Sequence, residues 1–353
     1  MIAQVKDMYS FLYKLATDEY KGPKFLLVKI LLYFLSLFYG LIVAMLAFLN
    51  GLYKRRLGCK VISVGNITLG GTGKTSLVEY IVRYLKEQGR QVAILSRGYG
   101  GGDEPVMLQQ KLKGVAVIVN ADRARAASEA VKDYAADTVV LDDGFQQWRL
   151  HKDLEVVTID AVNPFGNRHL LPRGILREPL SSLKRADIFV LAKTNLAKDT
   201  LELKRFLNGA NPRAPVFESI HKPAGLYDFN KPVELLGIES LKEESVALFC
   251  GIADPDSFEK LIKNSGIKAG LSFRFPDHYS YSEEDLKRIA EEAKRSNINT
   301  LLTTEKDAAR LYAQGRPPQA AAGQRILVLR VELEIKGDDK ERFHNRLLAL
   351  QPL

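Results

Sequence analysis

The sequence predicts an α/β protein with a domain built on a parallel sheet, a smaller second α/β domain and a hydrophobic helix in front of both. Short apolar segments alternate with amphipathic segments over most of the chain, a pattern typical of parallel strands joined by helices. Twenty residues without a charge, Ile30 to Leu49, precede the first of these segments. At 353 residues the chain exceeds the usual roughly 100–200 residues per domain, so we expect more than one core.

The composition indicates a globular protein with an anionic partner. Hydrophobic residues make up 46% and charged residues 26% of the chain, and the formal net charge is +9. This positive charge favours nucleic acid, anionic lipid or a phosphorylated substrate as partner. No interleaving of aromatic and basic residues is present, so nucleic acid is not expected. The cysteines, Cys59 and Cys250, lie far apart without metal-ligand spacing, which suggests a reducing compartment.

The segment Ile30 to Leu49 is long enough, as a helix of about 30 Å, to cross the hydrocarbon core of a membrane. It is too long for a cleavable signal peptide and is followed by no cleavage site. Basic residues flank it on both sides and therefore set no clear orientation: Lys21, Lys24, Lys29, Lys54, Arg55 and Arg56. A span, a helix embedded in one leaflet and a helix buried in the protein remain open. We favour membrane attachment over a strict span and assign residues 1–56 to a membrane-associated helical segment.

A strand, a glycine-rich turn and a helix follow one another from Val61 onwards. Val61 to Val64 reads as a buried strand, and Ser76 opens an amphipathic helix. Glycines between them allow backbone N–H groups to converge on phosphate oxygens at the start of the helix. This arrangement resembles a P-loop, although Thr68 stands where the full pattern has glycine. It predicts a P-loop NTPase-like domain that binds ATP through Thr68, Leu69, Gly70, Gly71, Thr72, Gly73, Lys74, Thr75 and Ser76.

Further segments continue the alternation. We assign residues 57–222 to the P-loop domain and residues 223–353 to the smaller α/β domain. A stretch rich in Pro, Gly and Asn, residues 208–239, suggests a linker between them. The other expected strands are 91–96, 115–119, 138–141, 154–160, 186–191, 245–250, 300–304 and 326–333, and the other expected helices include 124–134, 256–265 and 282–296.

Two carboxylates follow the strand that ends at Leu141. Downstream of a P-loop, an acid at the carboxyl end of a buried strand is typically needed to hold Mg²⁺. We therefore expect Asp142 and the Thr75 hydroxyl to bind the metal. Asp143 is either a second ligand or a group that supports the first.

Seven short motifs occur in an order that resembles the tetraacyldisaccharide 4′-kinase family, also called lipid A 4′-kinases. They cover residues from about Val61 to Leu311 and read GNITLGGTGKT, SRGY, GDEP, LDDGFQ, LPRGILREP, FPDHY and TTEKD. The resemblance implies transfer of the γ-phosphate of ATP to the 4′-hydroxyl of a tetraacylated glucosamine disaccharide 1-phosphate, a step of lipid A and lipopolysaccharide biosynthesis. The chain departs from the family between SRGY and GDEP, where only Gly100 to Gly102 replace a longer insertion.

The same resemblance implies roles for individual residues. Lys74 would act on the transferring phosphate, and Asp103 and His278 would act together as the base that accepts the proton of the hydroxyl. Arg177 and Glu178 would line the substrate site. From the residues alone, His278 in its Pro-Asp-His turn is more often structural than catalytic, and Arg177-Glu178 could be a surface ion pair.

The implied cofactors are ATP as co-substrate and Mg²⁺. The implied partners are the lipid substrate and an anionic inner-membrane surface, at the cytoplasmic face of the bacterial inner membrane, with no nucleic acid and no obligate protein partner. The alternative is a membrane-associated P-loop switch ATPase of the partitioning or positioning type. Those proteins place lysine just before the first glycine of the pair, where this chain has Leu69.

Overall fold

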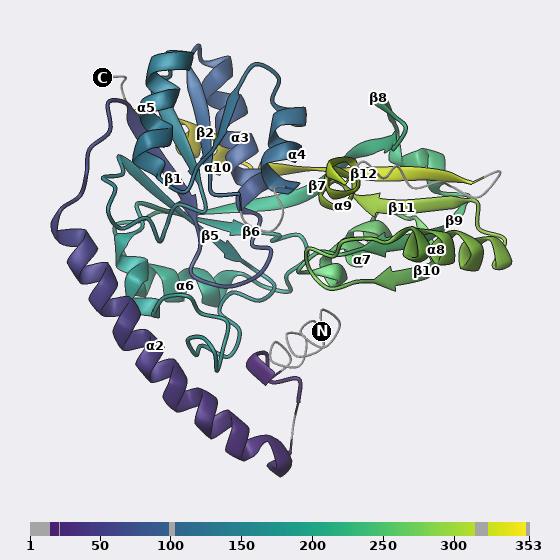
Figure 1. The fold of residues 1–353 in the computed structure, drawn as a ribbon, viewed down its shortest axis with the longest axis horizontal. Coiled ribbons are helices and arrows are strands. Elements are labelled where there is room, and N and C mark those ends of the chain that lie inside the picture. The colour runs from purple at the N-terminus through teal and green to yellow at the C-terminus, as the bar shows by residue number, and fades with distance from the viewer. Residues whose placement is uncertain (1–14, 21, 99–102, 315–323, 351–353) are drawn as a thin grey trace. The chain divides into compact units, whose positions relative to one another are not determined.

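The computed structural model describes residues 15–20, 22–98, 103–314 and 324–350. These residues form two compact units (Figure 1). Unit 1 comprises Met1–Arg97, Val115–Ile220 and Ile335–Leu353, and unit 2 comprises Gly98–Gly114 and His221–Glu334.

Unit 1 is built on a parallel sheet with the strand order β6-β5-β1-β4-β2-β3. The first residues of a further strand, β7, pair in parallel with β6. Parallel strands covered on both faces require continuous apolar runs, and almost every residue of the central strands is accordingly buried. The strands are β1 (Lys60–Gly65), β2 (Val92–Ser96), β3 (Ala116–Val119), β4 (Thr138–Asp142), β5 (Leu154–Asp160), β6 (Ile188–Ala192) and β7 (Val216–Asp228).

Helices cover the sheet of unit 1. Alternate residues of β1, β2 and β4 pack on the alanine-rich face of α5 in one core cluster. Residues of β5 and β6 pack on α6 and on the 3₁₀ helix η3 in another. Because the order of strands reverses at β1, its carboxyl end is where an α/β sheet of this kind binds ligands. The helices are α3 (Lys74–Glu87), α5 (Arg123–Tyr134), η3 (Leu180–Arg185), α6 (Leu201–Ala210) and α10 (Asp339–Leu348).

Unit 2 contains parallel strands in the order β10-β9-β11-β12, and β12 is followed in the sheet by β7. The end of β7 forms an antiparallel pair with β8. One core cluster joins this sheet to α8 and α9, and another joins it to α7. The elements are β8 (Lys231–Leu236), η4 (Ile238–Leu241), β9 (Ser245–Cys250), β10 (Lys268–Arg274), β11 (Thr300–Thr304), β12 (Arg325–Ile335), α4 (Asp103–Lys111), α7 (Pro255–Asn264), α8 (Glu283–Arg295) and α9 (Glu305–Ala313).

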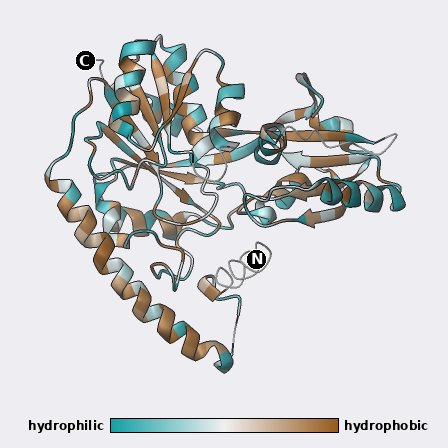
Figure 2. Cartoon of the chain, in the orientation of Figure 1, coloured by the Kyte–Doolittle hydropathy of each residue, from teal (hydrophilic) through white to brown (hydrophobic). Residues whose placement is uncertain are grey.

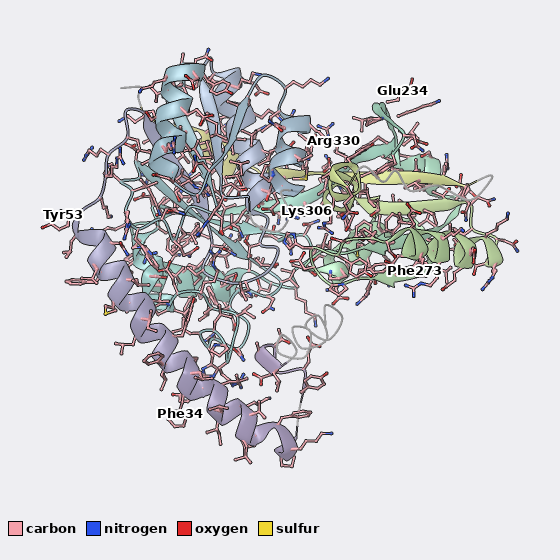
Figure 3. The ribbon with its side chains drawn as sticks, in the orientation of Figure 1. Phe34, Tyr53, Glu234, Phe273, Lys306 and Arg330 are labelled. Carbon is pink, nitrogen blue, oxygen red and sulfur yellow. The ribbon has the colours of Figure 1, made fainter. Side chains whose placement is uncertain are left out.

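The predicted hydrophobic helix is present as α2 (Leu26–Leu52), preceded by η1 (Pro23–Phe25). It is apolar over most of its length (Figure 2), and by length and composition alone it could cross a membrane. Only Leu32, Ser36 and Val43 are buried, whereas Phe34, which Figure 3 labels, is 63% exposed. The alternative of a helix buried inside the protein is therefore wrong for most of α2.

The organisation of the chain differs from the sequence-based expectation in two places. Residues 208–239, predicted as a linker between domains, include the passage from unit 1 to unit 2 at Ile220–His221, but most of them form β7 and β8. Residues 98–114, expected in the P-loop domain, group with unit 2 because α4 packs on α9 there. The sequence did not predict β10, α6, α9 or α10. The assignment of 1–56, 57–222 and 223–353 as domains remains a prediction.

Candidate active site

The glycine-rich turn between β1 and α3 has the backbone that a phosphate site requires. Gly70 and Gly73 have φ of 107° and 80°, a region that side chains rarely adopt. Gly73 is the N-cap of α3, so the helix begins at Lys74, two residues before the start at Ser76 that the sequence predicts. In the first turn of a helix the backbone N–H groups have no acceptor within the helix, and together with the helix dipole they favour an anion at this position.

The turn is fixed by the segment that contains Arg177. The Leu69 N–H donates to the Ile175 carbonyl at 2.8 Å, and the Arg177 N–H donates to the Ile67 carbonyl at 2.7 Å. These bonds make a short antiparallel bridge between Thr68 and Leu176. The backbone pairing therefore brings Arg177 to the P-loop, as expected for a residue of the site.

Four side chains form a charged network beside the turn. Lys74 Nζ and Arg177 Nη1 both donate to Asn66 Oδ1, each at 3.3 Å. Arg177 Nη1 also donates to the two carboxylate oxygens of Asp143 at 2.9 and 3.0 Å, and Lys74 Nζ lies 3.7 Å from Asp143 Oδ1. Two cations are thus held next to the helix N-terminus, where negative phosphate oxygens would bind.

The environment of Asp143 keeps this carboxylate ionised. Burial by itself raises the pKa of Asp143, but the charges of Lys74 and Arg177 and the hydrogen bonds from Arg177 outweigh it and hold the pKa below its usual value. Its φ of 56° is rare for a residue other than glycine. Because its two oxygens already pair with Arg177, the geometry favours the supporting role over direct metal binding.

Asp142 and Thr75 lie on neighbouring elements. Asp142 is the last residue of β4 and pairs in register with Val64 at the end of β1. Thr75 is in the first turn of α3, and both side chains are buried. A carboxylate and a hydroxyl are hard oxygen donors, which suit Mg²⁺ completed by water and phosphate oxygens. Among the described residues no group of three or more His, Cys, Asp or Glu is placed to hold a metal ion.

Arg177 and Glu178 do not form the ion pair with each other that their sequence allows. Glu178 is 1% exposed and pairs with Arg185 at 2.8 Å, and it accepts a hydrogen bond from Gln146 Nε2 at 3.0 Å. Neighbouring residues of an extended segment point to opposite sides, so each finds its own partner. A substrate role for either residue remains a prediction.

Asp103 and His278 both belong to unit 2. Asp103 is the first residue of α4, and its side chain lies outside the described part of the structure. His278 is exposed, with Nε2 3.8 Å from Asp277 Oδ2 and its N–H bonded to the Gly251 carbonyl at 3.1 Å. Their action as one base therefore stays a prediction, and the short connection Gly100 to Gly102 also lies outside the described residues.

Sequence reasoning missed several polar residues around the P-loop. Asn66 is fully buried and joins Lys74 to Arg177, and Gln146 donates from Nε2 to the Asn66 carbonyl at 3.0 Å. Arg123, buried at the start of α5, adds positive charge near Asp143. Asn66 and Gln146 lie inside the GNITLGG and LDDGFQ motifs, and this position in a motif could have marked them as residues of the site. Arg123 lies in no such motif.

Comparison with known proteins decides the family. The family model described as tetraacyldisaccharide-1-P 4′-kinase matches residues 28–102 and 101–351, which is nearly the whole chain. The chain belongs to this family.

Individual relatives agree with the match. A tetraacyldisaccharide 4′-kinase of Anaeromyxobacter dehalogenans (strain 2CP-C) is 41% identical over 79% of each chain. That of Halothermothrix orenii is 34% identical over 96% of this chain and 97% of its own. The crystal structure of LpxK from Aquifex aeolicus in complex with ATP is 28% identical, with a TM-score of 0.68, over 91% of this chain and 99% of that one. The predicted fold class, a P-loop sheet domain with a second α/β unit, is confirmed.

Proposed function

We propose that this protein is an ATP-dependent lipid kinase of lipid A biosynthesis, which phosphorylates the 4′-hydroxyl of a tetraacylated glucosamine disaccharide 1-phosphate. The observation that carries the proposal is its membership of the tetraacyldisaccharide-1-P 4′-kinase family together with a preformed phosphate site. Family membership leaves the alternative, a switch ATPase of the partitioning type, without support.

The charges at the P-loop suggest how transfer is assisted. Lys74 and Arg177 would neutralise charge on the phosphate oxygens, and most of the rate enhancement in phosphoryl transfer comes from such positioning and electrostatics. Asn66 and Asp143 hold both cations in place. Thr75 and Asp142 would hold Mg²⁺, which supplies further positive charge to the phosphates when bound.

Acceptance of the hydroxyl proton is assigned to unit 2. A sugar hydroxyl is a poor nucleophile, so a base that removes its proton during transfer speeds the reaction. Asp103 and His278 are the residues we propose for it, on the resemblance of the GDEP and FPDHY motifs.

A lipid acceptor gives a role to α2. Its exposed apolar surface and the basic residues at both ends match the interface of an anionic bilayer. We propose attachment to the cytoplasmic face of the bacterial inner membrane, where ATP is available.

Deletion of residues 1–54 should release protein from vesicles containing anionic lipid and raise the KM for the lipid more than that for ATP. Equal sedimentation with vesicles for both proteins would contradict this role.

The kinase function is tested by following the label of γ-³²P-ATP. With the lipid acceptor, label should enter the lipid, and ATP turnover should depend on that acceptor. ATP turnover that is unaffected by the lipid, with no label in it, would contradict the proposal.

The metal assignment is tested by titrating Mg²⁺. Asp142→Asn should raise the Mg²⁺ concentration needed for half-maximal rate by about tenfold or abolish activity, because it removes a direct ligand. Asp143→Asn should lower the maximal rate while leaving that concentration nearly unchanged. If the two variants shift the titration equally, Asp143 is also a ligand.

A further inference from the structure

The start of α9 contacts two separate segments of unit 2. α9 begins at Glu305, directly after β11, within the motif Thr303-Thr304-Glu305-Lys306-Asp307. The roles proposed above use none of these residues. Glu305 and Lys306 contact α4, whereas Asp307 contacts the loops that follow β9 and β10.

The helix α4 packs on α9 (Figure 1). Glu305 and Lys306 of α9 each form an ion pair with one end of α4. At the carboxyl end, Lys111 Nζ lies 2.9 Å from Glu305 Oε2, and the two side chains are only 9% and 11% exposed. At the amino end, Lys306 Nζ donates to Glu104, the neighbour of Asp103. Removing one partner of a pair this well buried leaves an uncompensated charge, so the contact constrains where α4 lies.

Asp307 anchors the other segment. It is fully buried and accepts hydrogen bonds from the Gly251 N–H at 2.9 Å and the Tyr281 hydroxyl at 2.8 Å. Thr304, the N-cap of α9, donates to its second oxygen at 2.6 Å. Both carboxylate oxygens are thus satisfied, as burial of a carboxylate requires.

Arg310 extends the anchor to the loop of His278. Its Nη1 lies 3.1 Å from Asp307 Oδ1 and donates to the carbonyls of Gly251 and Tyr279 at 3.1 and 3.2 Å. The Gly251 carbonyl is also the acceptor for the His278 N–H, at 3.1 Å. The backbone position of His278 therefore depends on groups that α9 holds.

We propose that the first turns of α9 are a positioning element. They fix the start of α4 and the His278 loop relative to each other, so that unit 2 alone positions both residues of the proposed base. Glu305, Lys306 and Asp307 are positioning residues, because they act through α4 and the loop. The inference rests on the proposed base, Asp103 with His278.

The test removes one charge at the far end of α4. In the full-length protein, Lys111→Met keeps most of the side-chain stem and lacks only the ammonium that pairs with Glu305. It should lower kcat for the lipid by about tenfold through a small displacement of Asp103, while the KM for ATP stays within about twofold. Lys287→Met, at an exposed lysine of α8 in the same unit, is the matched control and should change neither. Hydrogen exchange of the α4 amides should accelerate in Lys111→Met only.

The charge reversal Lys111→Glu with Glu305→Lys should restore part of the lost kcat, since it rebuilds the ion pair but not the hydrogen bond that Glu305 accepts from the Val331 N–H. In an Asp103→Ala background, Lys111→Met should lower kcat by less than about twofold, because its effect acts through Asp103. The inference would be overturned, with the proposed base left standing, by either of two results. One is a Lys111→Met enzyme whose kcat equals that of Lys287→Met. The other is a Lys111→Met substitution that lowers kcat by the same factor in the wild-type and Asp103→Ala backgrounds. Normal kcat in Asp103→Ala itself would overturn the proposed base, and the inference with it.

Discussion

Asp143 in unit 1 and His278 in unit 2 have the same unusual backbone and very different surroundings. Each follows the end of a parallel strand with φ of 56°, a conformation that costs residues other than glycine on the order of 1–2 kcal/mol. The side chain of Asp143 is held by Arg177 and Lys74. The backbone N–H of His278 donates a hydrogen bond to the Gly251 carbonyl, which fixes the backbone there. The side chain is 38% exposed, and its Nε2 lies 3.8 Å from Asp277 Oδ2.

The difference shows two degrees of preorganisation in one protein. The phosphate site has its cations in place before any ligand is considered, as electrostatic catalysis requires. The proposed base has a defined backbone and a side chain that is partly exposed to solvent, and the hydrogen bonds of catalytic bases often tighten only in the complex with substrate.

The largest effect is expected at the preorganised phosphate site. Lys74→Ala should lower kcat by about 1,000-fold or more, because it removes charge from the transferring phosphate in a site built around it. The fold should persist, since Arg177 still pairs with Asp143. Lys132→Ala, at an exposed lysine of α5, is the matched control for kcat and for the melting temperature. Near-normal turnover in folded Lys74→Ala protein would contradict the assignment of the P-loop.

A smaller effect is expected at His278. His278→Asn suits the test because Asn tolerates the left-handed backbone, so the substitution removes mainly the imidazole. It should lower kcat roughly 100-fold and leave the KM for ATP nearly unchanged. Combined with Asp103→Ala, it should cost little more than either change alone, as for residues that act as a unit. Multiplicative losses would mean independent roles, and normal kcat would make His278 a structural turn residue.

The smallest effect concerns stability and pH. The pKa of Asp143 in the folded protein is below its usual 3.8, so the contribution of its ion pairs is present above about pH 4 and lost as pH falls through the folded-state value. Asp143→Asn should therefore lower stability by about 1–2 kcal/mol at pH 7, where the carboxylate accepts charged hydrogen bonds. Thermal melts should give a constant difference between the proteins from pH 8 to about 5 that closes below about 4. If the difference in stability between the wild-type protein and Asp143→Asn did not depend on pH, the packing of the side chain, and not its charge, would account for it.

Much of the fold could be predicted because its signals are local. β1, α3, β4, β5 and α8 were predicted to within two residues, since apolar periodicity and capping residues depend on neighbours a few positions apart. The composition of residues 208–239 predicted a linker, and the chain does pass from unit 1 to unit 2 there, but it did not predict β7, whose parallel partner β6 lies earlier in the chain, or the antiparallel pair of β7 with β8. Strand formation in general depends strongly on such context.

Local signals in the sequence are enough to place most of the strands of unit 1, the P-loop turn before α3, the carboxylates at the end of β4 and the apolar character of α2. Tertiary contacts, by contrast, pair Arg177 with Asp143, 34 residues away, and join Arg177 to Lys74 through Asn66, while Glu178 pairs with Arg185. They also place residues 98–114 in unit 2. The physical reason is that backbone conformation follows from nearby residues, whereas the partner of a charge depends on which distant segments the sheet and its backbone bridges bring beside it.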